Sequence, residues 1–427
     1  MAPKRVVVTG MAVNTPLGDT LDDFLDGLLA GKSAVSRWKC FANEPVDSKI
    51  GADLSGYDVA NRIATLETRL PPETFRRLRR LTRRVPWATQ LSLLVAADAW
   101  LDAGLADVPA DPGRLAVIVG GHNIGSAYCH QTGRQFLDEP DLIDGMYCLY
   151  KLDSDHAGCV SELLQAHGPI YTAGAACASG NLALRSAVDE IRHHGQEAVL
   201  VLGPVLHLSP VDVQSMALMG AISTGTFDDE PEKASRPFDV RREGFVPAHG
   251  LGALLLEEQG AASRRGARIY AEVLAVAAGA DGNHLPQPCM EGQVRVMRKA
   301  LEESGLRPEQ IDHVSAHATS TPAGDISEIR AIKEVFGRHA YRLKINAPKS
   351  MLGHTCWSAA VVELIAAILQ MRAGVLHPSI NIDELDPEID LDVCRGAKAA
   401  HPVKHLVKNS FGFGGINCVS VIRRAGD

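Results

Sequence analysis

The sequence predicts an α/β protein made of two halves of similar layout. Short apolar segments rich in β-branched residues alternate with segments of helical periodicity along most of the chain. The length of 427 residues exceeds one ordinary hydrophobic core, which favours two structural units. A strand, a tight turn and an apolar helix follow one another twice, once around Cys177 and once around His354. We therefore place the halves at residues 1–257 and 258–427, without a low-complexity linker between them.

The first half is predicted to begin with a strand and to continue by alternation. Thr20 is expected to cap a helix with an acidic first turn, and Gly195 to stop the helix that follows Cys177. Residues 38–74 give few signals and are predicted as a mixed loop region, and residues 207–235 as an irregular excursion at a pocket or at the surface. The remaining predictions for this half are strands at 6–8, 115–119, 169–173, 198–202 and 251–256, and helices at 91–103 and 183–191.

The second half repeats the pattern. Its strongest signal is an apolar helix at 358–371 that stops at Gly374, preceded by a turn that carries His354. Cys177 and His354 are thus predicted to occupy matching places, and a pseudo-twofold axis would bring both helix N-termini to one cavity. The other predicted elements are strands at 267–276, 311–316 and 343–347 and a helix at 293–304.

Composition and charge restrict the class of function. The chain is 46% hydrophobic and 22% charged, as in ordinary globular proteins. A net charge of −8 argues against general nucleic-acid binding, and the absence of an apolar run of about 18 residues predicts no membrane span. The N-terminus is too short in its apolar part for a signal peptide. Nine cysteines without paired spacing favour reduced thiols in a cytoplasmic protein and no metal site.

Cys177 is the main candidate for a nucleophile. It lies in Gly174-Ala-Ala-Cys-Ala-Ser-Gly180, where a strand turns into a helix between small residues that allow close approach. The positive end of a helix favours the thiolate, and the amide of Cys177 would be free to bind a developing oxyanion. The alternative is a buried structural cysteine, and this stretch alone leaves both interpretations open.

Three further groups of residues have chemical character. His317 ends a strand and is followed by the hydroxyls of Thr319 and Thr321, although a lone histidine is more often structural. Glu363 lies within an apolar helix and needs a partner, for which Lys349 is the obvious candidate. The turn at 409–417 has glycines that free backbone amides to face a ligand, while its two phenylalanines could equally be core side chains.

Residues 76–84 contain six arginines in nine positions. In a chain that is acidic overall, this run suits an acidic partner or a phosphate. A solvated helix face is the equally weighted alternative.

Several motifs in fixed order resemble one family. They are Cys177 within Ala-Cys-Ala-Ser-Gly, His317-Ala-Thr-Ser-Thr, Lys349-Ser-Met-Leu-Gly-His354, Asn409-Ser-Phe-Gly-Phe-Gly-Gly and Ser235-Arg-Pro-Phe-Asp. Together they span essentially the whole chain and resemble the elongating β-ketoacyl-[acyl-carrier-protein] synthases, which are acyltransferases. The resemblance implies the thiolase fold, with duplicated halves stacked in five α-β-α-β-α layers. It also implies a homodimer, or a heterodimer with a related subunit.

The resemblance implies a decarboxylative Claisen condensation without a bound cofactor, on substrates carried by the phosphopantetheine of an acyl carrier protein. Cys177 would accept an acyl group, and a malonyl-type thioester would lose CO₂ while His317 and His354 donate hydrogen bonds to the enolate oxygen. The backbone N–H groups of Cys177 and Phe413 would hold the acyl oxyanion. The other implied roles are support of the histidines by Lys349 and Glu363, substrate binding by Thr319, Thr321, Phe411, Phe413 and Met219, and carrier-protein docking by Arg76, Arg77, Arg79 and Arg80.

The sequence departs from the family pattern in four places. Ala318 and Trp357 stand where glycines are expected, His249 lies in Pro-Ala-His-Gly instead of Gly-Asp-Gly, and Gly203-Pro-Val-Leu-His207 replaces Gly-Gly-Ala-Glu. These changes favour a specialised polyketide or fatty-acid pathway over housekeeping elongation. They leave open a malonyl-carrier-protein decarboxylase and, less favoured because Cys177 is intact, a non-catalytic chain-length subunit. Trp357 either packs in the core or narrows the substrate cavity.

Overall fold

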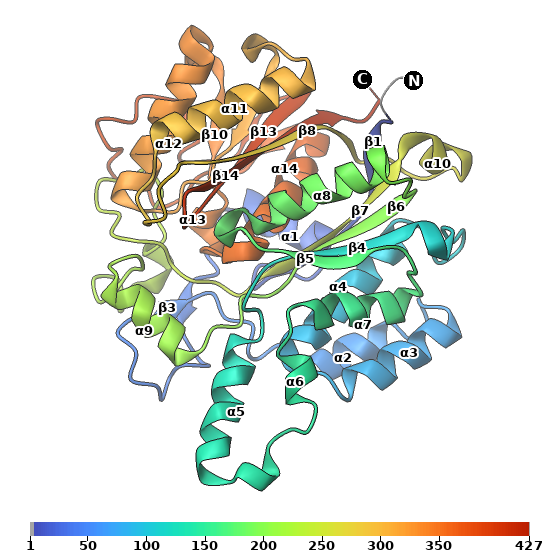
Figure 1. Cartoon of the computed structure of the whole chain (residues 1–427). Helices are drawn as coiled ribbons and strands as arrows, with labels where there is room; N and C mark the ends of the chain where they lie inside the picture. Colours follow the sequence, from blue (N-terminus) through green and yellow to red (C-terminus); the bar gives the residue numbers. More distant parts are fainter. Residues whose placement is uncertain (1–3, 427) are drawn as a thin grey trace.

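A computed structural model describes residues 4–426 and shows a layered α/β molecule with both described chain ends on the same side (Figure 1). Ten strands of the described chain form one continuous mixed sheet in the order β10-β9-β13-β14-β8-β1-β7-β6-β4-β5. The strands of the first half are β1 (Val6–Asn14), β4 (Leu115–Gly120), β5 (Ile170–Ala173), β6 (Ala198–Gly203) and β7 (Leu251–Glu258). Those of the second half are β8 (Ala271–Ala280), β9 (His313–Ser315), β10 (Lys344–Asn346), β13 (His405–Gly412) and β14 (Ile416–Arg424).

The strand order confirms the predicted duplication. The first half runs β1-β7-β6-β4-β5 and the second half runs β8-β14-β13-β9-β10, so each half places its first, fifth, fourth, second and third strands side by side. The two halves meet where β1 and β8 pair antiparallel, over residues 6–8 and 271–273. Each half thus contributes five adjacent strands of the shared sheet, and these two parts of the sheet form the two β layers of the molecule.

Helices complete five layers. The helices α8 (Ser179–His193) and α14 (Ala359–Ala373) lie in the middle and contact strands of both halves. The outer face of the first half is covered by α4 (Trp87–Asp102) and α7 (Ser154–Leu164), and that of the second half by α11 (Met290–Ser304) and α12 (Pro322–Phe336). This is the expected α-β-α-β-α stacking.

The middle layer is the most apolar part of the molecule. An 18-residue window over Cys356–Ala373 reaches a mean hydropathy of 1.4, which by length and composition would suffice to cross a membrane. In the structure 89% of this window is buried inside the protein, where α14 packs against α8, β6 and β7. Its hydropathy is therefore that of a central core helix.

Most predicted elements are confirmed, with differences that have local causes. Residues 38–74, predicted as a loop region, contain the helix α2 (Val59–Thr65), which buries none of its residues and so lacks the apolar stripe that reveals a helix. The predicted excursion at 207–235 contains α9 (Pro210–Leu218), begun by a capping box between Ser209 and Asp212. The strand predicted from residue 267 begins at Ala271 and extends to Ala280. Thr20 caps α1 (Leu21–Leu29) as predicted.

Smaller elements complete the chain. They are α3 (Pro72–Thr82), α5 (Ser126–Asp138), α6 (Tyr147–Tyr150), α10 (Gln259–Arg264), α13 (Lys349–Leu352) and the two-residue strands β2 (Ser36–Arg37), β3 (Ile50–Gly51), β11 (Val375–Leu376) and β12 (Ala399–Ala400).

Three buried histidines predict a pH-dependent stability. Burial lowers the pKa of His156 and His377 to about 4 and that of His313 to about 3. An unfolded histidine titrates near about pH 6.5, so below that pH the unfolded chain binds protons that the native chain does not, and stability decreases as the pH falls toward about 4. Replacing His156 with Gln should reduce this slope by about 1.4 kcal/mol per pH unit between about pH 6 and about pH 5. Urea unfolding at several pH values measures the slope, and an unchanged slope would contradict the assignment.

Candidate active site

Cys177 lies in a strained turn between β5 and α8. The turn is a single 3₁₀ turn, Ala176–Ala178, in which Ala176 has a φ of 46°, a left-handed conformation that costs energy for a residue with a Cβ. Ser179 holds the turn, because its Oγ accepts a hydrogen bond from the Ala175 N–H at 2.8 Å and donates one to the Ala176 carbonyl at 2.7 Å. The thiol is thereby fixed at the start of α8, as the sequence predicts.

The second half contains a turn that matches the one around Cys177, but His354 does not occupy the position in that turn that corresponds to Cys177. The 3₁₀ turn Cys356–Ser358 immediately precedes α14, as Ala176–Ala178 precedes α8, and Cys356 has a φ of 47°. The counterpart of Cys177 is therefore Trp357, and His354 precedes the turn. The sequence prediction of matching places for Cys177 and His354 is wrong by these three residues, because strand and helix periodicity do not locate a turn to the residue.

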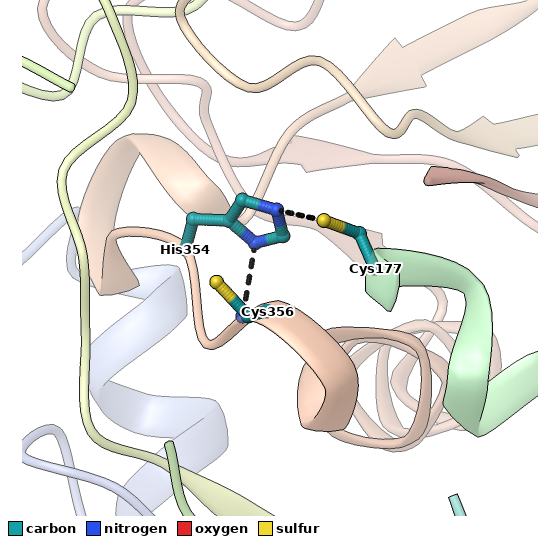
Figure 2. A group of neighbouring side chains, drawn as sticks. All are labelled: Cys177, His354 and Cys356. Carbon is teal, nitrogen blue, oxygen red and sulfur yellow. Dashed lines mark hydrogen bonds between the residues drawn. The ribbon is translucent and has the colours of Figure 1, made fainter. Parts of the chain in front are cut away.

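His354 contacts the Cys177 thiol directly. Its Nε2 lies 3.0 Å from Sγ, and its Nδ1 accepts a hydrogen bond from the Cys356 backbone N–H at 3.2 Å (Figure 2). An acceptor at Nδ1 places the ring proton on Nε2, so His354 donates toward the sulfur. The Nε2–H of His354 can also donate to an oxygen of a ligand that binds next to the Cys177 sulfur.

The surroundings of Cys177 favour its thiolate. The neighbouring Cys356 thiol and His354, with the Lys349 charge, outweigh desolvation and hold the pKa of Cys177 well below its ordinary value. Cys177 is 9% exposed and lines a cavity, so its thiol is within reach of a ligand, and its lowered pKa favours the thiolate.

His317 lies across the cavity from His354, with ring centroids 5.5 Å apart. Glu328 accepts the backbone N–H of His317 at 2.8 Å and that of Ala318 at 2.7 Å, which fixes the strand end. Burial, followed by the charges of Lys349 and the other cations beneath it, holds the pKa of His317 well below its ordinary value. His317 is therefore a neutral imidazole that can donate one ring N–H.

A buried ion group lies beneath the site and supports His317. Lys349 Nζ lies 2.5 Å from Glu363 and donates to the His317 carbonyl at 2.6 Å, which confirms the predicted contact between Lys349 and Glu363. Lys408 also contacts Glu363, at 2.8 Å, and was not predicted. The sequence nevertheless contains a signal for this contact. Lys408 is a cation within the apolar strand Leu406-Val-Lys408, so it needs a buried partner of opposite charge.

The cavity next to Cys177 has a volume of about 320 Å³. A Cβ placed on Gly412 would come within 3.2 Å of the Cys177 nitrogen, so the loop after β13 approaches the nucleophile as closely as glycine allows. The Thr319 and Thr321 hydroxyls lie 3.0 Å apart. The cavity lining includes every predicted substrate-binding residue, namely Thr319, Thr321, Phe411, Phe413 and Met219, and also Phe245, which was not predicted.

The arginine run forms a basic surface on α3. Arg76, Arg79, Arg80, Arg83 and Arg84 surround one shallow depression. Arg77 differs, because it is half-buried and its guanidinium donates to the Leu163 carbonyl at 3.1 Å and to Thr74 Oγ1 at 3.1 Å. Arg77 thus joins α3 to α7, and its inclusion with the docking arginines is corrected.

Trp357 packs behind the cavity wall. It is 8% exposed and belongs to an apolar cluster with Trp38, Leu206 and Phe245. Phe245 also lines the cavity, whereas Trp357 is not among the described residues that do so. This placement favours core packing over narrowing of the cavity.

The comparisons with known proteins agree with this site. The sequence matches the family described as "Beta-ketoacyl synthase, N-terminal domain" over residues 3–262 and "Beta-ketoacyl synthase, C-terminal domain" over residues 270–383. The fold is that of a ketosynthase of the thiolase-like superfamily. The chain belongs to the β-ketoacyl synthase family.

Relatives within this family differ in role. The chain is 33% identical to the polyketide biosynthesis malonyl-ACP decarboxylase PksF of Bacillus subtilis, over 99% of this chain and 98% of that protein. It is 32% identical to 3-oxoacyl-[acyl-carrier-protein] synthase 2 of Coxiella burnetii, over 100% of both. A type II polyketide ketosynthase solved in complex with its acyl carrier protein superposes with a TM-score of 0.86 at 28% identity, over 99% of this chain and 100% of that chain.

Replacement of Trp357 by Ala tests the packing account. Loss of a buried tryptophan should lower the free energy of unfolding by about 3–5 kcal/mol, which urea titration measures. The preference among acyl groups of different length should stay as in the wild type, because the side chain lies outside the cavity. A variant of full stability that accepts longer acyl groups would contradict this account.

Proposed function

We propose that the protein is a β-ketoacyl-carrier-protein synthase of a specialised polyketide or fatty-acid pathway, which condenses an acyl group on Cys177 with a malonyl-type carrier-protein thioester. The observation that carries the proposal is the Cys177 sulfur, which lies 3.0 Å from His354 Nε2 and on the same cavity as His317, in surroundings that lower its pKa. A thiolate nucleophile and two neutral N–H donors are the groups that this reaction needs.

In the acyl-transfer half, the Cys177 thiolate attacks the thioester carbonyl of the first substrate. The tetrahedral oxyanion is held by the backbone N–H groups of Cys177 and Phe413, whose loop lies against the nucleophile at Gly412. The intermediate then expels the pantetheine thiolate and leaves an acyl-cysteine.

In the decarboxylation half, the thioester oxygen of the malonyl group accepts the N–H groups of His317 and His354. Loss of CO₂ leaves an enolate on that oxygen, and the two donors stabilise the negative charge as it develops. The enolate carbon attacks the acyl-cysteine carbonyl, a C–C bond forms, and the Cys177 thiolate leaves. Thr319 and Thr321, which line the cavity, would bind the pantetheine arm.

A second candidate function is the release of acetyl-carrier-protein from malonyl-carrier-protein. It is favoured by the 33% identity to a protein named as a malonyl-ACP decarboxylase over 99% of the chain. The two histidines suffice for the loss of CO₂, and only the use of Cys177 as an acyl acceptor separates the two functions.

Mass spectrometry of the carrier protein distinguishes them. With acyl- and malonyl-carrier-protein together, the synthase yields a 3-oxoacyl-carrier-protein, and Cys177→Ala should abolish that product while CO₂ release continues. His317→Ala should slow CO₂ release by about 10²-fold or more and leave acylation of Cys177 nearly intact. His354→Ala should impair both, because His354 also contacts the sulfur. Acetyl-carrier-protein as the sole wild-type product would overturn condensation in favour of decarboxylation.

We further propose that an acidic acyl carrier protein docks on the basic surface of α3. Arg79, Arg80 and Arg83 are exposed there, although Arg80 also contacts Glu162. Attraction between such a surface and an acidic partner is long-ranged and is screened by salt.

Reversal of Arg79, Arg80 and Arg83 to Glu should raise the apparent Michaelis constant for carrier-bound substrates and weaken its dependence on salt. A short pantetheine thioester should react as with the wild type. Arg338→Glu, an exposed arginine of the other half, is the control for charge reversal. Equal loss with both kinds of substrate would mean that α3 has a structural role only.

A second subunit, in a homodimer or in a heterodimer with a related chain, would cover the sheet edge at β5. The strand β5 ends the sheet, and Ile170 on it is 43% exposed. Antiparallel pairing of β5 with a second copy would cover this edge and continue the sheet. Exposed apolar residues of the adjoining segment 136–152 would join the interface, namely Phe136, Leu137, Leu142, Met146, Leu149 and Leu152.

A further inference from the structure

We propose that Cys356 is a positioning residue whose thiol donates its S–H to the Cys177 thiolate and shares with His354 the stabilisation of the nucleophile. The proposal concerns the ionisation of Cys177 and applies equally to acyl transfer and to any other reaction of that thiol. It goes beyond the proposed function, because neither half-reaction above assigns a role to the side chain of Cys356.

The geometry places two thiols and one imidazole together. The two Sγ atoms and a ring nitrogen of His354 all lie within 4.8 Å of one another, and all three residues are buried (Figure 2). Cys177 comes from the turn before α8 and Cys356 from the matching turn before α14, so the pseudo-twofold packing of the two turns brings the sulfurs together.

The tautomer of His354 assigns the roles in this group. Nδ1 accepts the Cys356 N–H and Nε2 carries the proton, so the imidazole offers a donor to Cys177 and no lone pair to a metal ion between the three groups. A metal ion bound at Nε2 would require a proton on Nδ1, directed against the Cys356 N–H. If the Cys177 thiolate accepts hydrogen bonds from His354 Nε2–H and from the Cys356 S–H, each polar atom of the three side chains has a partner.

Cys177, rather than Cys356, is the ionised thiol. It receives the Nε2–H donor at 3.0 Å and lies at the start of the 15-residue helix α8. The pKa of Cys356 is raised well above its ordinary value, first by the neighbouring Cys177 sulfur and then by burial, so Cys356 keeps its proton. In a site of low dielectric, a weak S–H donor contributes more than it would in water.

The other groups that face Cys177 are few. His354 and Lys349 act on it from the second half, and His317 lies across the cavity. All three remain in place when the Cys356 side chain is removed, and the backbone N–H that fixes the His354 tautomer also remains. The thiol of Cys356 can therefore be tested separately.

The test is the pH dependence of Cys177 alkylation by iodoacetamide, followed by mass spectrometry of the Cys177 peptide in the intact protein. In Cys356→Ala the midpoint should rise by about one pH unit, which lowers the alkylation rate about tenfold at a pH below both midpoints. Cys356→Ser, which restores a donor, should return the midpoint toward that of the wild type. This measurement requires no carrier protein and no turnover, so it is independent of the proposed reaction.

Cys418→Ala is the matched control. Cys418 is a fully buried cysteine of β14, and its substitution should leave the midpoint for Cys177 unchanged. Thermal unfolding establishes that each variant is folded before alkylation. An unchanged midpoint in folded Cys356→Ala, or an equal shift in Cys356→Ala and Cys356→Ser, would overturn the proposal, since a merely structural effect does not depend on the donor.

Discussion

The active site depends on a carboxylate that is buried with two lysines. Glu363 is 2% exposed, and although desolvation alone would raise its pKa, Lys349 and Lys408 hold that pKa below the ordinary value. Two ammonium groups and one carboxylate leave a net positive charge beneath the cavity. That charge adds to burial in disfavouring a proton on His317 and adds to the contacts of Cys356 and His354 in favouring the thiolate of Cys177. One buried group thus contributes to both protonation states that the proposed chemistry needs. Removing Glu363 alone would leave two unpaired buried cations.

Duplication supplies the geometry that this charge acts on. Two equivalent turns, each with a residue at a φ near 46–47°, meet at the N-termini of α8 and α14. The halves then diverge: the first contributes the nucleophile at Cys177, and the second places Trp357 at the equivalent position and contributes His354 from the segment before the turn. A symmetric fold thus produces an asymmetric site, because the same backbone carries different side chains in its two copies.

The sequence was informative where the signal was local and less so where contacts were long-range. The alternation of elements, the motif order and the need of Glu363 for a cation predicted the fold, the place of Cys177 at a strand-to-helix turn and the contact with Lys349. The second cation, Lys408, lies 45 residues further along the chain on another element, and only the register of β13 places it there. Cys356 was unremarkable in the sequence, since its proximity to Cys177 arises from the packing of two turns 177 or more residues apart. Arg77 shares its composition with the docking run but faces α7, because helical phase separates it from its neighbours.

The departures from the family pattern are related in space. Trp357 belongs to the same apolar cluster as Leu206, which lies in the segment that replaces Gly-Gly-Ala-Glu of the family pattern. The ring of Trp87 lies 4.8 Å from that of His207 and 5.5 Å from that of His249, two further departures. A large side chain next to a catalytic histidine is tolerated when its neighbours change with it. The changes at residues 203–207, 249 and 357 therefore form one repacked wall behind Phe245, whereas Ala318 packs in the core of the second half.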